Sequence, residues 1–218
     1  MFDLKNVTFS YDSANIILDD VSMKIEKGVA AAITGANGCG KTTLLRLLNG
    51  LSFPNKGKYF FDGTEITRKK ISDIRFAKEF HRRVGFVFQS ADAQLFCGSV
   101  EDEIAFGPRQ LNLEESEIRT RVDDCLSLLE ITRLRFRAPY SLSGGEKRRV
   151  AFACVLALNP DALVVDEPLA SLDASGQSIV MDLFQTLRDA GKTIVFASHS
   201  DALVNKVADV AFNIEKGV

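Results

Sequence analysis

Residue types that could hold a triphosphate gather in one short segment, which reads Gly35-Ala-Asn-Gly-Cys-Gly-Lys41-Thr42. The spacing G-x-x-x-x-G-K-[ST] is that of a phosphate-binding loop, whose glycines let successive backbone N–H groups turn toward phosphate oxygens. Lys41 would place a positive charge near the β- and γ-phosphates, and the Thr42 hydroxyl would reach a bound Mg²⁺. The segment therefore predicts a nucleoside triphosphate site, against the alternative of a glycine-rich turn that binds no ligand.

The segments on either side of this loop are those that a phosphate-binding loop requires. Val29–Thr34 is an apolar run typical of a buried strand. Lys41 begins a helical pattern that stops at Gly50. This strand-loop-helix order favours the phosphate site over a plain turn.

Two adjacent acids follow another apolar segment. Ala162–Val165 is short and wholly apolar, as in a buried parallel strand, and Asp166 and Glu167 come directly after it. Because the carboxyl ends of parallel strands meet at one edge of a sheet, we expect both carboxylates near the phosphate loop. Asp166 would hold Mg²⁺ through its water shell, and Glu167 would accept a hydrogen bond from an attacking water. The alternative is a pair of solvated acids at the end of a strand.

A second anion site is indicated by Ser143-Gly-Gly145, which precedes a helical pattern. Backbone N–H groups at a helix N-terminus attract anions, although this site has no lysine of its own. One chain has little use for two phosphate cradles, so the pair indicates an ATPase whose active site is completed by another subunit. The alternative is an ordinary serine cap.

Three further residues could take part in such a site, and each has a structural alternative. His199 follows the strand pattern Thr193–Ala197 and could reach a γ-phosphate, but a lone histidine is more often structural. Gln89 follows the strand candidate Val84–Phe88, where an amide is unremarkable. Tyr11 could stack on a purine, although most tyrosines in an early β region serve packing.

The order of the elements predicts an α/β fold. The first sixty residues read as strands, and strand patterns then alternate with helical patterns over Glu114–Ile131, Glu146–Leu158 and Ala174–Ala190. Asn112 and Glu115 resemble a capping box for the first of these helices. We expect a mostly parallel sheet with helices on its faces, an antiparallel β portion at the N-terminal end, and a helical subdomain over about residues 90–140.

Composition narrows the classes of function. The 218 residues suffice for one domain with a substantial core, and 27 Lys and Arg against 29 Asp and Glu argue against a nucleic-acid protein that depends on bulk charge. No apolar stretch approaches the ~20 residues that span a bilayer, and the N-terminus lacks a signal-peptide core. We therefore expect a cytosolic chain, unless a partner holds it at a membrane. Four widely spaced cysteines indicate reduced thiols.

Taken in order, these motifs resemble those of the nucleotide-binding subunits of ABC transporters over essentially the whole chain. The matching segments are Walker A at Gly35–Thr42, the Q-loop at Gln89, the signature at Leu142–Glu146, Walker B at Leu163–Asp166 followed by Glu167, the D-loop at Ser171–Asp173, the switch at His199, and the A-loop at Tyr11. The resemblance implies one ABC-type P-loop ATPase domain over residues 1–218. Departures are mild: Cys39, Glu146 and Leu169 stand where serine, glutamine and threonine are frequent.

The resemblance also implies a role for each site residue. Catalytic roles fall to Glu167, His199, Lys41 and Gln89, and Mg²⁺ binding falls to Thr42, Gln89 and Asp166. The expected ATP contacts are Tyr11, Gly35, Ala36, Asn37, Gly38, Cys39, Gly40, Lys41, Thr42, Thr43, Ser143, Gly144, Gly145, Glu146 and Asp173. Two ATPase subunits would pack head to tail, with each ATP between the Walker A loop of one and the signature of the other.

Two segments narrow the resemblance further. Val87–Phe96 and Val100–Pro108 are similar to the cobalt/nickel and energy-coupling-factor (ECF) branch of importers. That branch implies import of a metal ion or a vitamin, with a second ATPase, an integral membrane coupling protein and a small substrate-capturing membrane protein as partners. The chain would then lie peripherally at the cytoplasmic face of the cell membrane, and no nucleic acid is expected as a partner.

Three alternatives remain beside an importer. An ABC-type ATPase of DNA repair or chromosome maintenance normally carries a long coiled coil between Walker A and the signature, and a ribosome-associated one has two ATPase units. A non-catalytic regulatory paralogue is disfavoured because the motif lysine, acids and histidine are all present. The cluster Arg133, Arg135 and Arg137 beside Phe136 is the one feature that favours nucleic acid. It is otherwise a solvated loop, or a contact for the coupling protein or for lipid headgroups.

Overall fold

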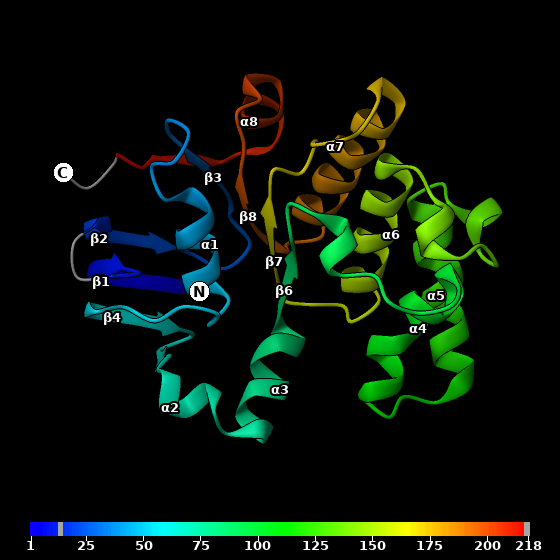
Figure 1. Cartoon of the computed structure of the whole chain (residues 1–218), viewed down its shortest axis with the longest axis horizontal. Coiled ribbons are helices and arrows are strands. Elements are labelled where there is room, and N and C mark those ends of the chain that lie inside the picture. Colours follow the sequence, from blue (N-terminus) through cyan, green and yellow to red (C-terminus); the bar gives the residue numbers. More distant parts are fainter. Residues whose placement is uncertain (13–14, 216–218) are drawn as a thin grey trace.

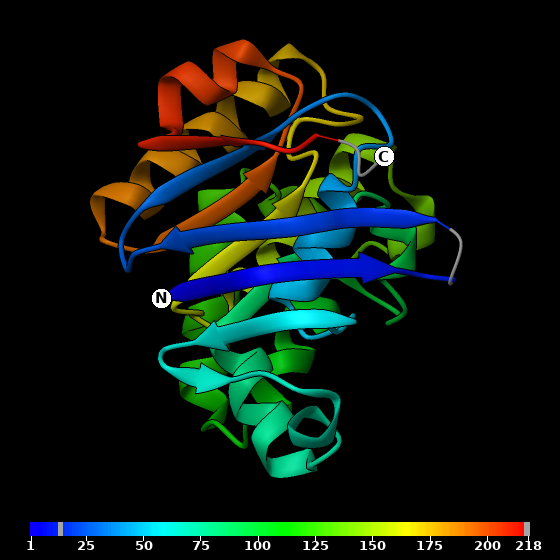
Figure 2. The same ribbon diagram turned by 90° about the vertical axis from the view of Figure 1, so that its left-hand side faces the viewer.

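Two β-sheets organise the protein, whose computed structural model describes residues 1–12 and 15–215. An antiparallel sheet has the order β2 (Ile16–Ile25), β1 (Phe2–Ser10), β4 (Lys56–Phe61) and β5 (Thr64–Glu65). A parallel sheet has the order β6 (Val84–Val87), β7 (Ala162–Asp166), β8 (Thr193–Ala197), β3 (Ala30–Thr34) and β9 (Val210–Asn213). Figure 1 shows the antiparallel sheet at the left and the parallel sheet in the middle, and Figure 2 views the antiparallel strands face on. The predicted sheet arrangement is confirmed.

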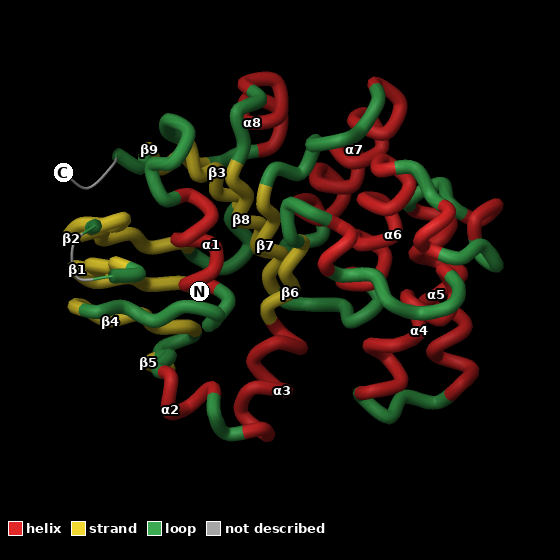
Figure 3. Tube along the Cα trace, viewed as in Figure 1, coloured by secondary structure: helices red, strands yellow, loops and turns green. Residues whose placement is uncertain are grey.

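The helices cover both faces of the parallel sheet (Figure 3). The helix α1 (Lys41–Leu48) lies between the two sheets and contacts β7, β8 and β2. On the other face lie α4 (Val100–Gln110), α5 (Glu115–Leu128), α6 (Gly144–Leu156), α7 (Ala174–Asp189) and α8 (Asp201–Val207). Two further helices, α2 (Arg68–Ile71) and α3 (Ile74–Arg83), connect the antiparallel sheet to β6.

Each face of the parallel sheet has its own hydrophobic core, because successive strand residues point to opposite faces. In β7, Leu163 and Val165 belong to the core shared with α4–α7, whereas Ala162 and Val164 belong to the core shared with α1 and the antiparallel sheet. Strands covered on both faces are apolar throughout. This explains why short apolar runs predicted β3, β6, β7 and β8, whereas β9, a half-exposed strand at the sheet edge, was not predicted.

The predicted helices are present; α1 and α7 start where expected, whereas the starts of α5 and α6 differ. The helix α6 begins at Gly144 rather than Glu146, because Ser143 and Glu146 form a capping box: Ser143 Oγ accepts from the Glu146 N–H at 3.3 Å, and Glu146 Oε2 accepts from the Ser143 N–H at 3.0 Å. The capping box expected at Asn112 and Glu115 is wrong. Glu114 is the N-cap of α5 and makes no side-chain cap bond, while Asn112 turns the chain with a φ of 54°.

The expected helical stretch over residues 90–140 contains α4 and α5, and α6 packs on both of them. The helical layer therefore continues past residue 140, and the limits of a subdomain stay a prediction. The sequence patterns did not predict α3, α8 or β9. Within the ranges that the structure describes, no helix is both long enough and apolar enough to cross a membrane.

Candidate functional site

The phosphate-binding loop connects β3 to α1, and its three glycines determine its shape. Gly35, Gly38 and Gly40 have φ values of 136°, 75° and 106°. Residues with a Cβ rarely adopt this backbone conformation. A Cβ on Gly35 would lie 2.3 Å from the carbonyl oxygen of Ile214, and one on Gly40 would lie 2.9 Å from Leu18 Cδ2. The loop is thus pressed against its neighbours, and glycine is required for this close approach.

Hydrogen bonds from the loop hold both charged groups in place: the Lys41 ammonium expected at the phosphates and the Asp166 carboxylate expected at the metal. Lys41 Nζ donates to the carbonyl oxygens of Gly35 at 2.9 Å and Ala36 at 3.0 Å. Thr42 Oγ1 donates to Asp166 Oδ2 at 2.8 Å. Asp166 ends β7 and is only 3% exposed. The structure therefore joins the phosphate loop to the strand-end acid, as the sequence predicted.

A cavity of about 520 Å³ opens beside these groups, within the usual range for ligand sites. Its lining comes from distant parts of the chain and comprises Ile17, Asn37, Gly38, Gly40, Lys41, Thr42, Thr43, Gln89, Asp166, Glu167, Ala170 and His199. Most of the residues expected to bind ATP phosphates, metal and water thus line one cavity. Sequence reasoning missed Ile17 and Ala170, which have no polar side chain to signal a role.

Glu167 and His199 lie next to each other in the lining of this cavity. His199 Nε2 lies 3.4 Å from Glu167 Oε1. Glu167 has a φ of 48°, and its backbone N–H donates to the carbonyl oxygen of Ala197 at 3.0 Å. This left-handed conformation directly follows the extended Asp166, so the adjacent carboxylates leave the backbone in different directions. Non-glycine residues in this conformation are strained and cluster at functional sites.

Two expected ATP contacts are placed less directly. Tyr11 is 62% exposed, its hydroxyl lies 3.3 Å from Thr43 Oγ1, and its ring packs edge-on against Phe9. It therefore presents an open ring face next to the cavity. Cys39 is only 2% exposed, and its side chain belongs to the core between the sheets. Any contact of Cys39 with a nucleotide would come from its backbone.

The signature lies apart from this cavity. Ser143–Glu146 line a separate depression of about 300 Å³, together with Arg133, Arg149, Ser171, Leu172 and Asp173. A Cβ on Gly145 would lie 3.1 Å from the carbonyl oxygen of Ser171, so the glycine lets α6 start directly against the D-loop. Asp173 caps α7 by accepting the Gly176 N–H at 2.8 Å. The residues predicted to bind ATP thus form two separate groups on one chain.

The electrostatics of the signature depend on Glu146. The hydrogen bond from the Ser143 backbone lowers the pKa of Glu146, and the charge of Arg133 lowers it further. Arg133 Nη2 donates to Glu146 Oε1 at 2.8 Å. Arg135 pairs with Asp123, and Arg137 donates to the carbonyl oxygen of Ser141 at 3.0 Å. Because each of these arginines has a partner within the chain, the cluster is better explained as a paired loop than as a nucleic-acid surface.

One residue near the cavity gave no signal in the sequence. Arg148, on α6, is 1% exposed, and it donates hydrogen bonds to backbone carbonyl oxygens of the Q-loop and of the strand end at β7. Only the fold shows that Arg148 contacts the backbone of the two predicted strand-end acids, Asp166 and Glu167.

Comparisons with known proteins agree with this arrangement. Residues 18–170 match the family described as ABC transporter. The nickel import ATP-binding protein LarO of Lactiplantibacillus plantarum is 45% identical, over 98% of this chain and 89% of its own length. The structure of cbiO1 from Clostridium perfringens, part of the ABC transporter complex cbiONQ, has a TM-score of 0.85 and 34% identity, over 98% of this chain and 84% of that one.

A second solved structure bears on assembly. A dimeric ATP-binding cassette in a post-hydrolysis state, bound to ADP and Pi, has a TM-score of 0.89 and 28% identity, over 99% of this chain and 94% of that one. Nearly the whole of this chain therefore has a counterpart in a cassette whose solved structure is a dimer bound to ADP and Pi.

Proposed function

Because the chain belongs to the ABC transporter family, as one of its ATP-hydrolysing subunits, we propose that it powers the import of a transition-metal ion, nickel or cobalt. The grouping of Lys41, Thr42, Asp166 and Glu167 around one cavity carries the ATPase assignment. The similarity to a nickel import protein supports the assignment of a metal ion as the cargo. A vitamin, the other cargo of the ECF branch, is the second candidate.

We place the phosphates of ATP along the loop and the purine toward the open face of Tyr11. The lysine Nζ would exchange its two loop carbonyls for oxygens of the β- and γ-phosphates. The site fits Mg²⁺, a cation that prefers oxygen ligands, since the Thr42 hydroxyl and the buried Asp166 carboxylate lie 2.8 Å apart and Gln89 lines the same cavity. When bound, Mg²⁺ neutralises negative charge on the phosphate oxygens.

Hydrolysis would depend on Glu167 and His199. Glu167 would orient a water molecule and accept its proton, as a general base does. His199 lies beside the same carboxylate and would contact the γ-phosphate. Together the two side chains would hold the water against the phosphate.

A second ATPase subunit would complete each site, whether it is another copy of this chain or a different chain. The signature lines a depression separate from the cavity, so one chain by itself would leave the γ-phosphate of a bound ATP open to solvent. Head-to-tail packing would bring Ser143–Gly145 of one subunit onto the ATP of the other and would exclude water. The similar dimeric cassette supports this assembly.

The membrane partner would dock in an apolar groove of about 390 Å³ between α3, β6, α4 and α6. Phe96 and Phe106 line it, are 68% and 42% exposed, and pack with ring centroids 5.0 Å apart. Phe88 lines the same groove and precedes Gln89, so a helix of the coupling protein seated there would contact the Q-loop. This contact would hold the chain peripherally at the cytoplasmic face of the membrane, beside a small substrate-capturing membrane protein.

Uptake in the native cell tests this function. Cells with Glu167→Gln in the chromosomal copy should lose uptake of radioactive nickel or cobalt while uptake of labelled vitamins continues. Loss of vitamin uptake with normal metal uptake would transfer the assignment to a vitamin importer. If neither uptake changes, and the purified ATPase is stimulated by DNA or ribosomes, the importer function is wrong.

A further inference from the structure

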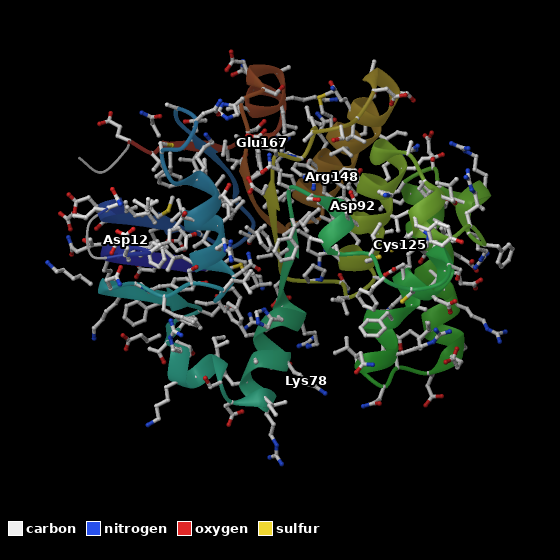
Figure 4. The ribbon with its side chains drawn as sticks, viewed as in Figure 1. Asp12, Lys78, Asp92, Cys125, Arg148 and Glu167 are labelled. Atoms are coloured by element: carbon white, nitrogen blue, oxygen red, sulfur yellow. The ribbon has the colours of Figure 1, made fainter. Side chains whose placement is uncertain are left out.

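A buried arginine joins three segments of the proposed active site. Arg148 lies in the second turn of α6, and Figure 4 labels it together with Glu167 in the middle of the molecule. Its Nη1 donates to the carbonyl oxygens of Phe88 and, at 3.3 Å, Gln89. Its Nη2 donates to those of Asp166 at 2.6 Å and Glu167 at 2.8 Å. One guanidinium thus spans the Q-loop and the end of β7.

Packing alone gives no reason for a charge at this position. Burial lowers the pKa of Arg148 to about 10, although the charges of Asp166 and Glu167 act in the opposite direction. Its Nε has no hydrogen-bond partner among residues 1–12 and 15–215. Replacing this arginine alone with an apolar residue would leave the carbonyl oxygens that it binds without their donors, which is costly for buried acceptors. The charge is therefore explained by those carbonyl groups and not by packing.

The carbonyl groups that Arg148 binds belong to residues whose orientation matters for hydrolysis. Glu167 is strained, and three hydrogen bonds hold its backbone: its N–H binds the Ala197 oxygen, and its carbonyl oxygen accepts from Ala170 at 3.1 Å and from Arg148. Of these bonds, the one with Ala197 involves the neighbouring strand β8, and the one with Ala170 lies within the turn after β7. The third comes from α6, the helix that begins with the signature.

We propose that Arg148 is a positioning residue, which fixes the backbone of Glu167 and of the Q-loop relative to α6. This inference rests on the proposed ATPase mechanism, in which Glu167 orients water. The same helix carries the signature at its N-terminus, so the arginine also links the segment that receives the partner's ATP to the acid that acts on this chain's own ATP.

Substitution of Arg148 should lower kcat with little change of KM for ATP. In Arg148→Met, the Walker A loop is intact, whereas Glu167 is free to shift, and a displacement of about 1 Å can cost on the order of 10²-fold in rate. Arg148→Lys keeps the charge but cannot bridge two pairs of carbonyl groups, so its kcat should be intermediate. The matched control is Arg121→Met, because Arg121 donates to the Ala157 oxygen at 2.7 Å at the far end of α6. The control should keep wild-type kcat.

A double-mutant cycle with Glu167→Gln separates positioning from a general structural effect. If Arg148 acts through Glu167, Arg148→Met should cost little further activity once the carboxylate is gone. An equal loss in both backgrounds, or wild-type kcat in Arg148→Met, overturns the inference. If Arg148→Met does not fold by thermal melting, the cycle is measured with Arg148→Lys and read by the same criteria. If Lys41→Ala leaves turnover unchanged, the proposed function itself is wrong, which is a distinct outcome.

Discussion

The cavity beside the phosphate loop and the depression at the start of α6 both suit phosphate, but they are built differently. The cavity combines charged side chains from two distant segments, Lys41 from the phosphate loop and Asp166 and Glu167 from the end of β7. The depression offers a helix N-terminus, and the side chain of Ser143 is already engaged in its capping box. We therefore expect catalysis in the cavity, and in the depression only the binding of an anion that is held elsewhere. A head-to-tail pair of chains would combine the two.

The largest expected loss of ATP turnover comes from removing the charge of Lys41 in the cavity. Lys41→Ala should reduce ATP turnover by on the order of 10³-fold or more, since it removes the charge at the β- and γ-phosphates. The melting temperature should change little, because among the residues that the structure describes Lys41 Nζ donates to loop carbonyl groups alone. The control is Lys192→Ala, because Lys192 Nζ binds Asn159 Oδ1 at 2.7 Å and the Pro160 oxygen at 2.9 Å, outside the cavity lining. A folded Lys41→Ala protein with wild-type turnover would exclude the P-loop assignment.

A somewhat smaller effect should distinguish the two acids. Glu167→Gln keeps the side-chain shape but loses the proton acceptor, which typically costs 10²–10⁴-fold in rate. Binding should persist, and a closed dimer should accumulate on size-exclusion chromatography with Mg-ATP. Asp166→Asn weakens the metal site instead, so it should lose the magnesium-dependent gain in ATP affinity and trap no dimer. Normal hydrolysis by Glu167→Gln would rule out its role as the base.

The signature should matter for hydrolysis but not for the first binding of ATP. Gly145→Val should keep ATP affinity in the cavity and lose about 10²-fold in turnover, because its side chain pushes α6 away from Ser171. Mixing it with Lys41→Ala should restore up to about a quarter of wild-type activity in a homodimer, since half of the dimers are mixed and have one intact site. If the mixture stays as inactive as its components, the two regions do not combine across subunits.

The smallest effect lies outside both regions, at His81 on α3 in the apolar groove. Burial lowers the pKa of His81 below its ordinary value of 6.5. The unfolded chain binds the extra proton first, so the stability from neutral His81 is fully present above pH 6.5 and is lost as the pH falls through the folded-state pKa. His81→Asn should flatten the fall of the melting temperature between pH 7 and pH 5, with unchanged ATP affinity. Parallel curves for the two proteins would contradict this.

The sequence by itself determined the features that depend on local backbone geometry and periodicity. The glycine spacing predicted a loop whose backbone can turn toward phosphate, and the structure gives these glycines positive φ values. The apolar run before Asp166 predicted a buried parallel strand. Local patterns were less reliable at helix ends. Asn112 and Glu115 matched a capping box that does not form, because the chain turns at Asn112 and α5 begins only after Glu114.

Only the tertiary structure decided which distant groups meet. Because the two sheets stack on each other, the Cys39 side chain is buried in the core between them. The position of α6 places the signature outside the cavity. Arg148 binds carbonyl groups 60 and 18 residues away along the chain. Such contacts depend on how layers pack against each other, and a guanidinium that binds backbone oxygens selects no particular side chain as its partner. For this reason no spacing or motif in the sequence could have revealed it.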